Sequence, residues 1–126
     1  MIWLPGFEEV ALAHERVVLR TGGDRGTRDA GLIESAVARA SAGFGGAEFY
    51  PTVQAKAAAI GHGLASNHGF VDGNKRVGVA VMLLILKMNG IRLSFTDDEL
   101  TRLGLDLAMD KVDVGGAQEW ISAHEA

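Results

Sequence analysis

The chain has 126 residues, of which 48% are hydrophobic, with a formal net charge of −4 and a pI near 5.5. This length and apolar content predict a single domain, residues 1–126, with a buried core. The acidic balance argues against direct nucleic-acid binding, which requires a basic face. Without cysteines the chain forms neither disulfides nor thiolate metal sites.

The first predicted helix has apolar residues at helical spacing and ends at Gly22-Gly23. The residues of its apolar face are Phe7, Val10, Ala11, His14 and Val18. His14 is interpreted as a core histidine with one satisfied hydrogen bond, in preference to a catalytic one. The N-terminus lacks the basic and apolar regions of a signal peptide, so we expect a cytoplasmic protein.

The first glycine-rich loop, residues 21–28, carries Arg25 and Arg28. Without a Walker spacing it is better explained as a solvated turn than as a phosphate cradle. Asp29 is expected to cap a second helix. The buried face of that helix consists of Leu32, Ile33, Ala36 and Val37.

A second glycine-rich segment, residues 41–50, contains aromatic residues and predicts a loop. Pro51 suits the first position of a third helix that closes near Asn67. Its apolar stripe is Val53, Ala57, Ile60 and Leu64. His62 and His68 are six residues apart, which does not match the i, i+4 spacing of zinc-binding helices.

Residues 77–86 include no charged side chain and lie between Arg76 and Lys87. The run is shorter than the ~20 residues of a membrane span, so it predicts a helix buried on all sides in the core. Asn89-Gly90 should end this helix. Apolar and polar side chains alternate over residues 91–95, which suggests a short strand, with Ile2 and Leu4 as candidate partners.

Two further helices are expected near the C-terminus. A capping box at Thr96–Glu99 precedes the first, whose apolar residues are Leu100, Leu103 and Leu107. Asp113 can cap the second, in which Ala117, Trp120 and Ile121 face inward. His124 is expected to be solvated. The sequence therefore predicts an all-α, compact helical bundle around one central helix, with at most a small β-hairpin or short strands.

Nine residues at the start of the central helix combine the polar groups expected of a catalytic site. The N-terminus of a helix favours anions, and Lys75 and Arg76 add two positive charges. Gly73 permits a backbone turn close to a ligand. Asp72 is a candidate Mg²⁺ ligand, and His68 can accept a proton near neutral pH. Phe70 is expected to anchor this loop in the core.

This motif resembles the Fic/Doc family of toxin-like phosphoryl and nucleotidyl transferases, whose pattern is His-Pro-Phe-x-x-Gly-Asn-Gly-Arg-x-x-Arg. The matching positions are His68, Phe70, Gly73, Asn74 and Arg76. Gly69, Lys75 and Val79 depart from the pattern, which has Pro, Gly and Arg there. Asn-Lys-Arg is the form of the Doc branch. The resemblance extends over most of the chain, including Arg28-Asp29 and Tyr50-Pro51.

The resemblance implies a toxin that transfers a phosphoryl group from ATP to a protein hydroxyl, with elongation factor Tu as the target, and so arrests translation. It implies that His68 is the general base and that Asp72 binds Mg²⁺. Gly73 and Asn74 would hold phosphate oxygens, while Lys75 and Arg76 offset charge on the transferring group. Residues 41–50 correspond to a flap that aligns the target peptide in Fic-like folds, or form an ordinary loop.

Two other functions remain open from the sequence. Adenylyl transfer is the commoner Fic chemistry, but it uses glycine at position 75 and arginine at position 79, where this chain has Lys75 and Val79. A catalytically inactive, protein-binding domain is the other alternative. The inhibitory Ser/Thr-x-x-x-Glu-Gly/Asn motif of some relatives is missing from the sequence. The resemblance therefore implies restraint by a separate Phd-type antitoxin, laid in a groove near residues 10–18, Arg25 and Arg28.

Overall fold

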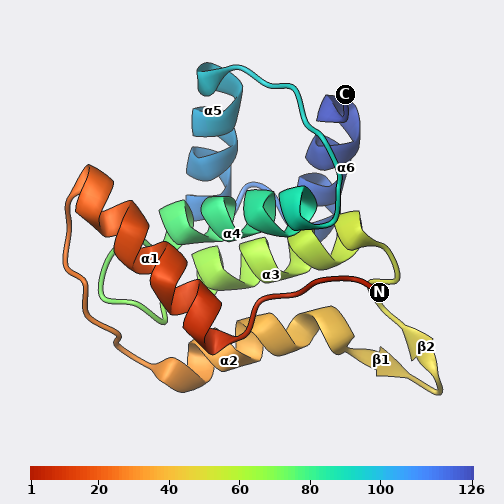
Figure 1. The fold of residues 1–126 in the computed structure, drawn as a ribbon, viewed down its shortest axis with the longest axis horizontal. Helices are drawn as coiled ribbons and strands as arrows, with labels where there is room; N and C mark the ends of the chain where they lie inside the picture. The colour runs from red at the N-terminus through yellow and green to blue at the C-terminus, as the bar shows by residue number, and fades with distance from the viewer.

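The computed structural model describes all 126 residues and contains six α-helices and one small β-hairpin (Figure 1). The helices are α1 (Phe7–Thr21), α2 (Ala30–Ala38), α3 (Val53–Asn67), α4 (Asn74–Met88), α5 (Asp97–Ala108) and α6 (Val114–His124). A 3₁₀ turn, η1 (Arg39–Ser41), follows α2, and β1 (Gly43–Phe44) pairs antiparallel with β2 (Ala47–Glu48). The predicted all-α class is confirmed.

Helices α3 and α4 form the centre of the molecule and lie side by side (Figure 1). They approach closely because small residues face each other where they meet. A Cβ added at Gly78 would lie 2.6 Å from the carbonyl oxygen of Gly61 and 3.1 Å from the Cβ of Ala65. Larger residues would separate the two backbones. The close contact fixes the end of α3 beside the start of α4, where the motif lies.

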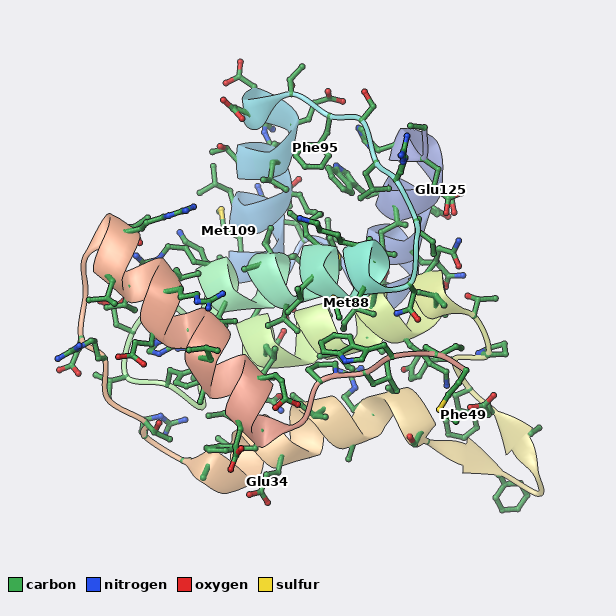
Figure 2. The ribbon with its side chains drawn as sticks, in the orientation of Figure 1. Glu34, Phe49, Met88, Phe95, Met109 and Glu125 are labelled. Atoms are coloured by element: carbon green, nitrogen blue, oxygen red, sulfur yellow. The ribbon has the colours of Figure 1, made fainter.

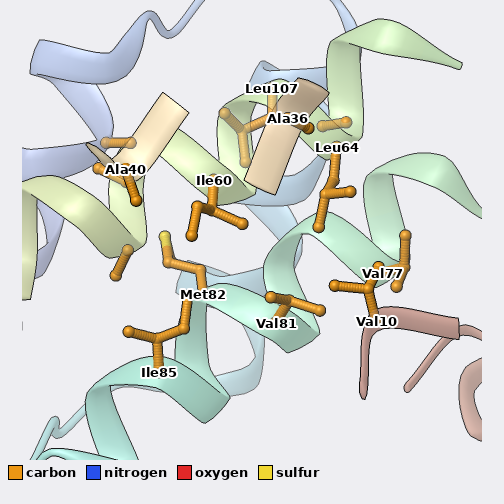
Figure 3. Packing of buried hydrophobic residues seen from close by; sticks show 14 of the residues in the cluster. Val10, Ala36, Ala40, Ile60, Leu64, Val77, Val81, Met82, Ile85 and Leu107 are labelled. Carbon is orange, nitrogen blue, oxygen red and sulfur yellow. The ribbon is translucent and has the colours of Figure 1, made fainter. Parts of the chain in front are cut away.

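The core lies mainly between α3, α4 and α2, and Figure 3 shows Ile60 beside Met82 and Ala40. Helix α3 is the more enclosed of the central pair, with ten buried residues against six in α4. The prediction that residues 77–86 form a helix buried on all sides is therefore wrong. Leu83 and Leu84 are only half-buried, because α1 and α5 cover α4 incompletely and leave a cleft between them.

Most helix boundaries follow the predicted caps. Asp29 accepts hydrogen bonds from the first turn of α2, and Asp113 accepts one from Gly116 of α6. Thr96 and Glu99 form the predicted capping box of α5. The prediction for Pro51 is wrong: Thr52 is the N-cap of α3, and the helix begins at Val53. A hydroxyl at this position satisfies a free backbone N–H group of the first turn, which proline cannot do.

The predicted strand over residues 91–95 does not form with Ile2 and Leu4. The backbone N–H and carbonyl of Trp3 bond instead to the side chain of Asn89, at 2.8 and 2.9 Å. Leu93 makes one isolated bridge with Glu125 at the other end of the chain. One asparagine side chain thus satisfies the N-terminal backbone groups that a strand would have used.

The hairpin forms within the second glycine-rich segment. Gly45 and Gly46 both have positive φ, as a tight two-residue hairpin turn requires. Phe44 is exposed, and Figure 2 shows Phe49 beside the hairpin. The hairpin is held to α3 by Lys56, whose buried Nζ donates to Glu48 Oε1 at 2.7 Å and to the Ala40 carbonyl at 2.7 Å.

Helices α5 and α6 run across the central pair (Figure 1). His124, predicted to be solvated, is mostly covered: its ring stacks on Trp120, and its Nε2 lies 2.6 Å from Glu99 Oε2. The prediction failed because the partner on α5 lies 25 residues away in the sequence. Across the whole fold, every helix is too short or too polar to span a lipid bilayer.

Candidate active site

The loop from His68 to Gly73 connects α3 to α4 and lines a pocket at the N-terminus of α4. This motif pocket has a volume of about 280 Å³. Its lining consists of seven motif residues and two alanines: His68, Val71, Asp72, Gly73, Asn74, Lys75 and Arg76, with Ala65 and Ala108. All six residues that the sequence proposed for the site therefore lie around one cavity.

His68 is the residue immediately after α3 and is exposed at the rim of the motif pocket. Its backbone is left-handed, with φ 54° and ψ 44°, a conformation that few residues other than glycine adopt. This turn reverses the chain at the end of the helix. The imidazole remains accessible to a ligand, as a general base must be.

Asp72 has one carboxylate oxygen bound and one free. Its Oδ1 accepts the Gly73 N–H at 2.8 Å and faces Arg76 Nη2 at 3.4 Å. Its Oδ2 lies against Gly23, where an added Cβ would approach it to 2.5 Å. The side chain is half-exposed. The free Oδ2 can therefore coordinate a cation. The absence of a side chain at Gly23 leaves room for the Asp72 carboxylate.

The side-chain amide of Asn74, expected to hold phosphate oxygens, bonds within the motif loop instead. Its Oδ1 accepts the Phe70 N–H at 3.0 Å, and its Nδ2 donates to the Phe70 carbonyl at 3.0 Å. Both polar atoms of the amide thus hold the loop in place. Phe70 is 2% exposed, which confirms that it anchors the loop in the core. Of the polar groups of Asn74, the backbone N–H at the start of α4 is the one placed to meet an anion.

Gly73 is the N-cap of α4, with φ 77°, and no side chain caps this helix. The N–H groups of the first turn therefore have no side-chain acceptor, and this helix end can accept an anion. Lys75 is exposed beside it. Arg76 is half-buried and donates from Nη1 to Thr21 Oγ1 and to the Gly22 carbonyl. It places its positive charge between α1 and Asp72.

A larger cleft of about 500 Å³ adjoins the motif pocket and shares Lys75 and Arg76 with it. It lies between α1, α4 and α5, and its floor is apolar. Its other lining residues are Val17, Arg20, Thr21, Val79, Ala80, Leu83, Leu100, Thr101, Gly104 and Leu105. Val79, at the position of the second family arginine, thus adds apolar surface where a cation would stand.

The first glycine-rich loop lies directly on the motif loop. Val71 donates its N–H to the Gly26 carbonyl at 2.9 Å, and Thr27 forms a β-bridge with Phe70. The loop is exposed on its outer side, as a solvated turn would be. Thr21 is its only residue that lines either cavity, so its glycines do not form a phosphate cradle. The glycine content of residues 21–28 predicted a loop but did not indicate that this loop contacts the motif loop.

His14 supports the motif loop from beneath. The side chain is buried, its Nε2 lies 2.7 Å from the Asp72 carbonyl oxygen, and its ring stacks on Phe70 with centroids 3.7 Å apart. The interpretation as a core histidine with one hydrogen bond is confirmed. In the sequence, the only sign of a specific partner was a polar residue on an apolar helix face. The partner itself could be identified only from the fold.

Gly69, where the family pattern has proline, packs tightly on α2. A Cβ at this position would lie 2.5 Å from Cγ1 of Ile33. Proline would therefore clash with Ile33 unless α2 moved.

His62 is half-buried and lies near Arg39 and Asp110. Burial, followed by the positive charge of Arg39, lowers the pKa of its ring. It takes no part in the site.

The site fits a magnesium ion that arrives with a nucleotide better than a preformed metal centre. No three histidine or acidic side chains gather to hold a metal. Mg²⁺ in phosphoryl-transfer sites is often held by one or two carboxylates together with the substrate phosphates and water. Asp72 supplies one carboxylate with a free oxygen, beside a helix N-terminus that suits phosphate.

The fold and the site define an all-α protein with an anion-binding helix end beside an exposed histidine. A profile described as the Fic/DOC family matches residues 4–86, about two thirds of the chain. The chain belongs to the Fic/DOC family and is Doc-like.

Two curated relatives carry Doc names. The chain is 45% identical over 73 residues to "Toxin Doc" of Mycolicibacterium smegmatis, a match over 58% of this chain and 56% of that protein. It is 29% identical over 112 residues to "Protein kinase doc" of Escherichia phage P1, covering 89% of this chain and 87% of that protein. The chain thus spans little more than half of the first relative and most of the second.

Proposed function

We propose that this chain is the toxin of a toxin–antitoxin pair and that it transfers a phosphoryl group from ATP to a hydroxyl of a protein. Elongation factor Tu is the proposed target, and arrest of translation the proposed outcome. Family membership supports this function, as do the names of the two relatives, one a toxin and one a protein kinase.

The observation that carries the proposal is the convergence of the motif on one pocket. His68, Asp72 and Lys75 line it at the uncapped N-terminus of α4. A base, a metal-binding carboxylate and positive charge are what phosphoryl transfer needs, because its catalysis is mainly positioning and charge neutralisation.

In the proposed reaction His68 accepts the proton of the target hydroxyl. The hydroxyl oxygen forms a bond to the γ-phosphorus, the bond from that phosphorus to the bridging oxygen breaks, and ADP leaves. The backbone N–H groups at the start of α4 and the side chain of Lys75 bind phosphate oxygens. Mg²⁺, held by Asp72 and the phosphates, would neutralise charge on the nucleotide.

Arg76 and Asn74 have supporting roles in the proposed reaction. Arg76 contributes its charge from between Asp72 and the end of α1. Asn74 orders the loop through Phe70 and offers its backbone N–H to phosphate.

Adenylyl transfer is the alternative chemistry. Lys75 stands where nucleotidyl-transferring relatives have glycine, and it lines both cavities. Val79, in place of the second arginine, belongs to the apolar floor of the large cleft. Both substitutions favour phosphoryl over adenylyl transfer. An inactive protein-binding domain is disfavoured because the polar side chains of His68, Asp72 and Arg76 are all present at the motif pocket.

We also propose restraint by a Phd-type antitoxin that folds as an amphipathic helix on this chain. The large cleft offers an apolar floor with Arg20, Lys75 and Arg76 at its edge, which suits a helix with acidic side chains. Arg25 and Arg28, expected from the sequence as groove walls, do not line it. The wall on α1 is formed by Val17, Arg20 and Thr21.

The test is incubation of the protein with ATP and Mg²⁺ in a bacterial lysate, followed by intact-mass analysis of modified proteins. A phosphoryl increment on one protein, removed by His68→Ala and by Asp72→Asn, is the expected result. Loss of a positioned base costs roughly 10²–10⁴ in rate. A nucleotidyl increment would replace the proposal with adenylyl transfer, and no increment would favour the binding domain.

Toxicity is tested separately by inducible expression in a bacterial host, with and without the adjacent reading frame. We expect growth arrest by the chain alone and rescue by co-expression of the antitoxin. Normal growth despite abundant folded protein would contradict the toxin assignment.

A further inference from the structure

His68 holds a backbone conformation that costs energy. Its left-handed φ of 54° is shared by only one other residue that is not glycine, Asp110. For a residue with a Cβ this conformation costs roughly 1–2 kcal/mol. Such conformations persist where neighbouring groups hold them in place. The groups that hold His68 therefore decide where its imidazole stands.

Arg28 provides those contacts from the first glycine-rich loop. Its Nε donates to the His68 carbonyl at 2.7 Å, and its Nη2 lies 3.5 Å from the Asn67 carbonyl. Its backbone N–H donates to the Gly69 carbonyl at 2.8 Å. One residue thus bonds to three consecutive carbonyls at the end of α3, spanning the position of His68.

The carbonyls of Asn67 and His68 lie at the end of α3, where a helix leaves its last carbonyl groups without intrahelical partners. A positive charge at a helix C-terminus is also favourable to the helix dipole. Arg28 therefore acts as a cap supplied from another part of the chain, 40 residues away from His68. The bonds go to the backbone of His68, so the imidazole remains free for chemistry.

We propose that Arg28 is a positioning residue that holds His68 in its left-handed conformation and so places the imidazole at the motif pocket. The inference rests on the proposed function of His68 as the base. Arg28 lines neither the motif pocket nor the large cleft, so it is not placed to bind the phosphates.

Arg25 is the matched control. It belongs to the same loop and is also an exposed arginine, but its contact is an ion pair with Glu15 at 3.7 Å. Arg25→Ala removes the same side chain and charge from the loop without touching the end of α3. Differences between Arg28→Ala and Arg25→Ala therefore report the contacts with the His68 segment.

The first experiment requires no catalysis. NMR spectra of the amides and histidine rings are recorded for the wild type, Arg28→Ala and Arg25→Ala. We expect Arg28→Ala to shift the amide signals of His68 and Gly69 and the ring signals of His68. Arg25→Ala should leave them in place. Unchanged His68 signals in Arg28→Ala would overturn the inference, whatever the activity of the protein.

The second experiment measures transfer of label from γ-phosphate-labelled ATP to protein in a bacterial lysate. We expect Arg28→Ala to lower kcat roughly 10- to 100-fold, since small displacements of a catalytic group have effects of this size. KM for ATP should change less than about twofold, because Arg28 does not line the nucleotide site. Arg28→Lys should recover part of the rate, since a lysine can donate to one carbonyl.

A double variant separates positioning from general damage to the fold. Because Arg28 acts through His68, adding Arg28→Ala to His68→Ala should lower the residual rate no further. Multiplicative losses, or equal rates in Arg28→Ala and Arg25→Ala, would contradict the inference. If the wild type and Arg25→Ala transfer no label, the proposed function fails, and the NMR comparison alone decides whether Arg28 positions His68.

Discussion

Residues 21–29 and residues 41–50 both join one helix to the next through several glycines, but they contact different parts of the molecule. The first segment lies on the motif loop, bonding through Gly26, Thr27 and Arg28. The second folds back on itself as the hairpin of β1 and β2, anchored to α3 by Lys56. The first thus determines the shape of the site, whereas the second extends away from it.

The glycines have different tasks in the two segments. Gly23 leaves room for the Asp72 carboxylate, whereas Gly45 and Gly46 provide only the positive φ of a turn, with open space around them. Glycines therefore make room for a candidate metal ligand in the first segment and allow the chain to turn in the second. Substitutions in the two segments should affect different measured properties.

The largest effect is expected for Gly23→Ala. The new Cβ would lie 2.5 Å from Asp72 Oδ2, and φ at this position is +117°. Asp72 must then move, and we expect a loss of transfer activity of roughly 100-fold. Gly22→Ala is the control, because φ there is also positive, at +86°, but nothing lies within 4 Å of the new atom.

Both glycine variants should lose stability, because alanine disfavours a positive φ. Gly22 combines φ 86° with ψ 169°, a region almost confined to glycine, where an alanine costs roughly 1–3 kcal/mol. Thermal unfolding and the labelled-ATP assay together test this pair. Equal activity in Gly22→Ala and Gly23→Ala would show that Gly23 has no special relation to Asp72.

Lys56→Met should destabilise the fold while leaving the chemistry intact. The buried ammonium donates to Glu48 and to the Ala40 carbonyl, and a lost buried hydrogen bond costs about 1–3 kcal/mol. We expect a lower free energy of unfolding by denaturant, with kcat unchanged at a temperature where the variant is folded. Glu48→Gln, which alters the half-exposed partner, should cost less.

If Lys56→Met abolished activity in the folded protein, the distinction between a site-forming loop and a remote hairpin would be incorrect. Hydrogen exchange at residues 43–48 provides the matching structural measurement. Faster exchange there, without a change around residues 68–76, is expected.

A smaller effect is expected at the contact between α5 and α6, which involves neither glycine-rich segment. The pKa of His124 is raised above 6.5, first by its hydrogen bond to the Trp120 carbonyl and then by Glu99. The pKa of Glu99 is lowered from 4.5, first by the backbone N–H of Thr96 and then by His124. Folding therefore favours the protonated form of His124 and the ionised form of Glu99.

The sign of the pH dependence follows from these two directions. The His124 contribution is fully present below pH 6.5 and is lost as pH rises through its raised pKa. The Glu99 contribution is present above 4.5 and is lost as pH falls through its lowered pKa. In denaturant unfolding, the stability gap between wild type and His124→Gln should therefore narrow as pH rises above 6.5 and through the raised pKa of His124. A constant gap would contradict the assignment.

The smallest effect on stability is expected for Phe44→Ser at the hairpin. Phe44 is 84% exposed, so the free energy of unfolding should change by less than about 0.5 kcal/mol. If the hairpin is the flap that aligns a target peptide, KM for the protein target rises while KM for ATP stays constant. An unchanged KM for the target would identify the hairpin as an ordinary loop.

The sequence by itself determined the helices, most of their caps and the composition of the site. Helical spacing predicted α1, and Asp29, Thr96 and Asp113 predicted three helix starts, because these signals depend on residues within one or two turns. The motif from His68 to Arg76 is equally local. Its residues surround one pocket because a six-residue loop cannot separate them.

Only the tertiary structure decided which distant segments support that motif. Arg28 meets the His68 carbonyl across 40 positions, and His14 meets the Asp72 carbonyl across 58. Both bonds end on backbone carbonyl groups, which every residue carries, so no pattern of side chains marks the acceptor. The strand wrongly predicted at residues 91–95, with Ile2 and Leu4 as partners, failed for a related reason: the backbone of Trp3 bonds instead to the side chain of Asn89, 86 positions away.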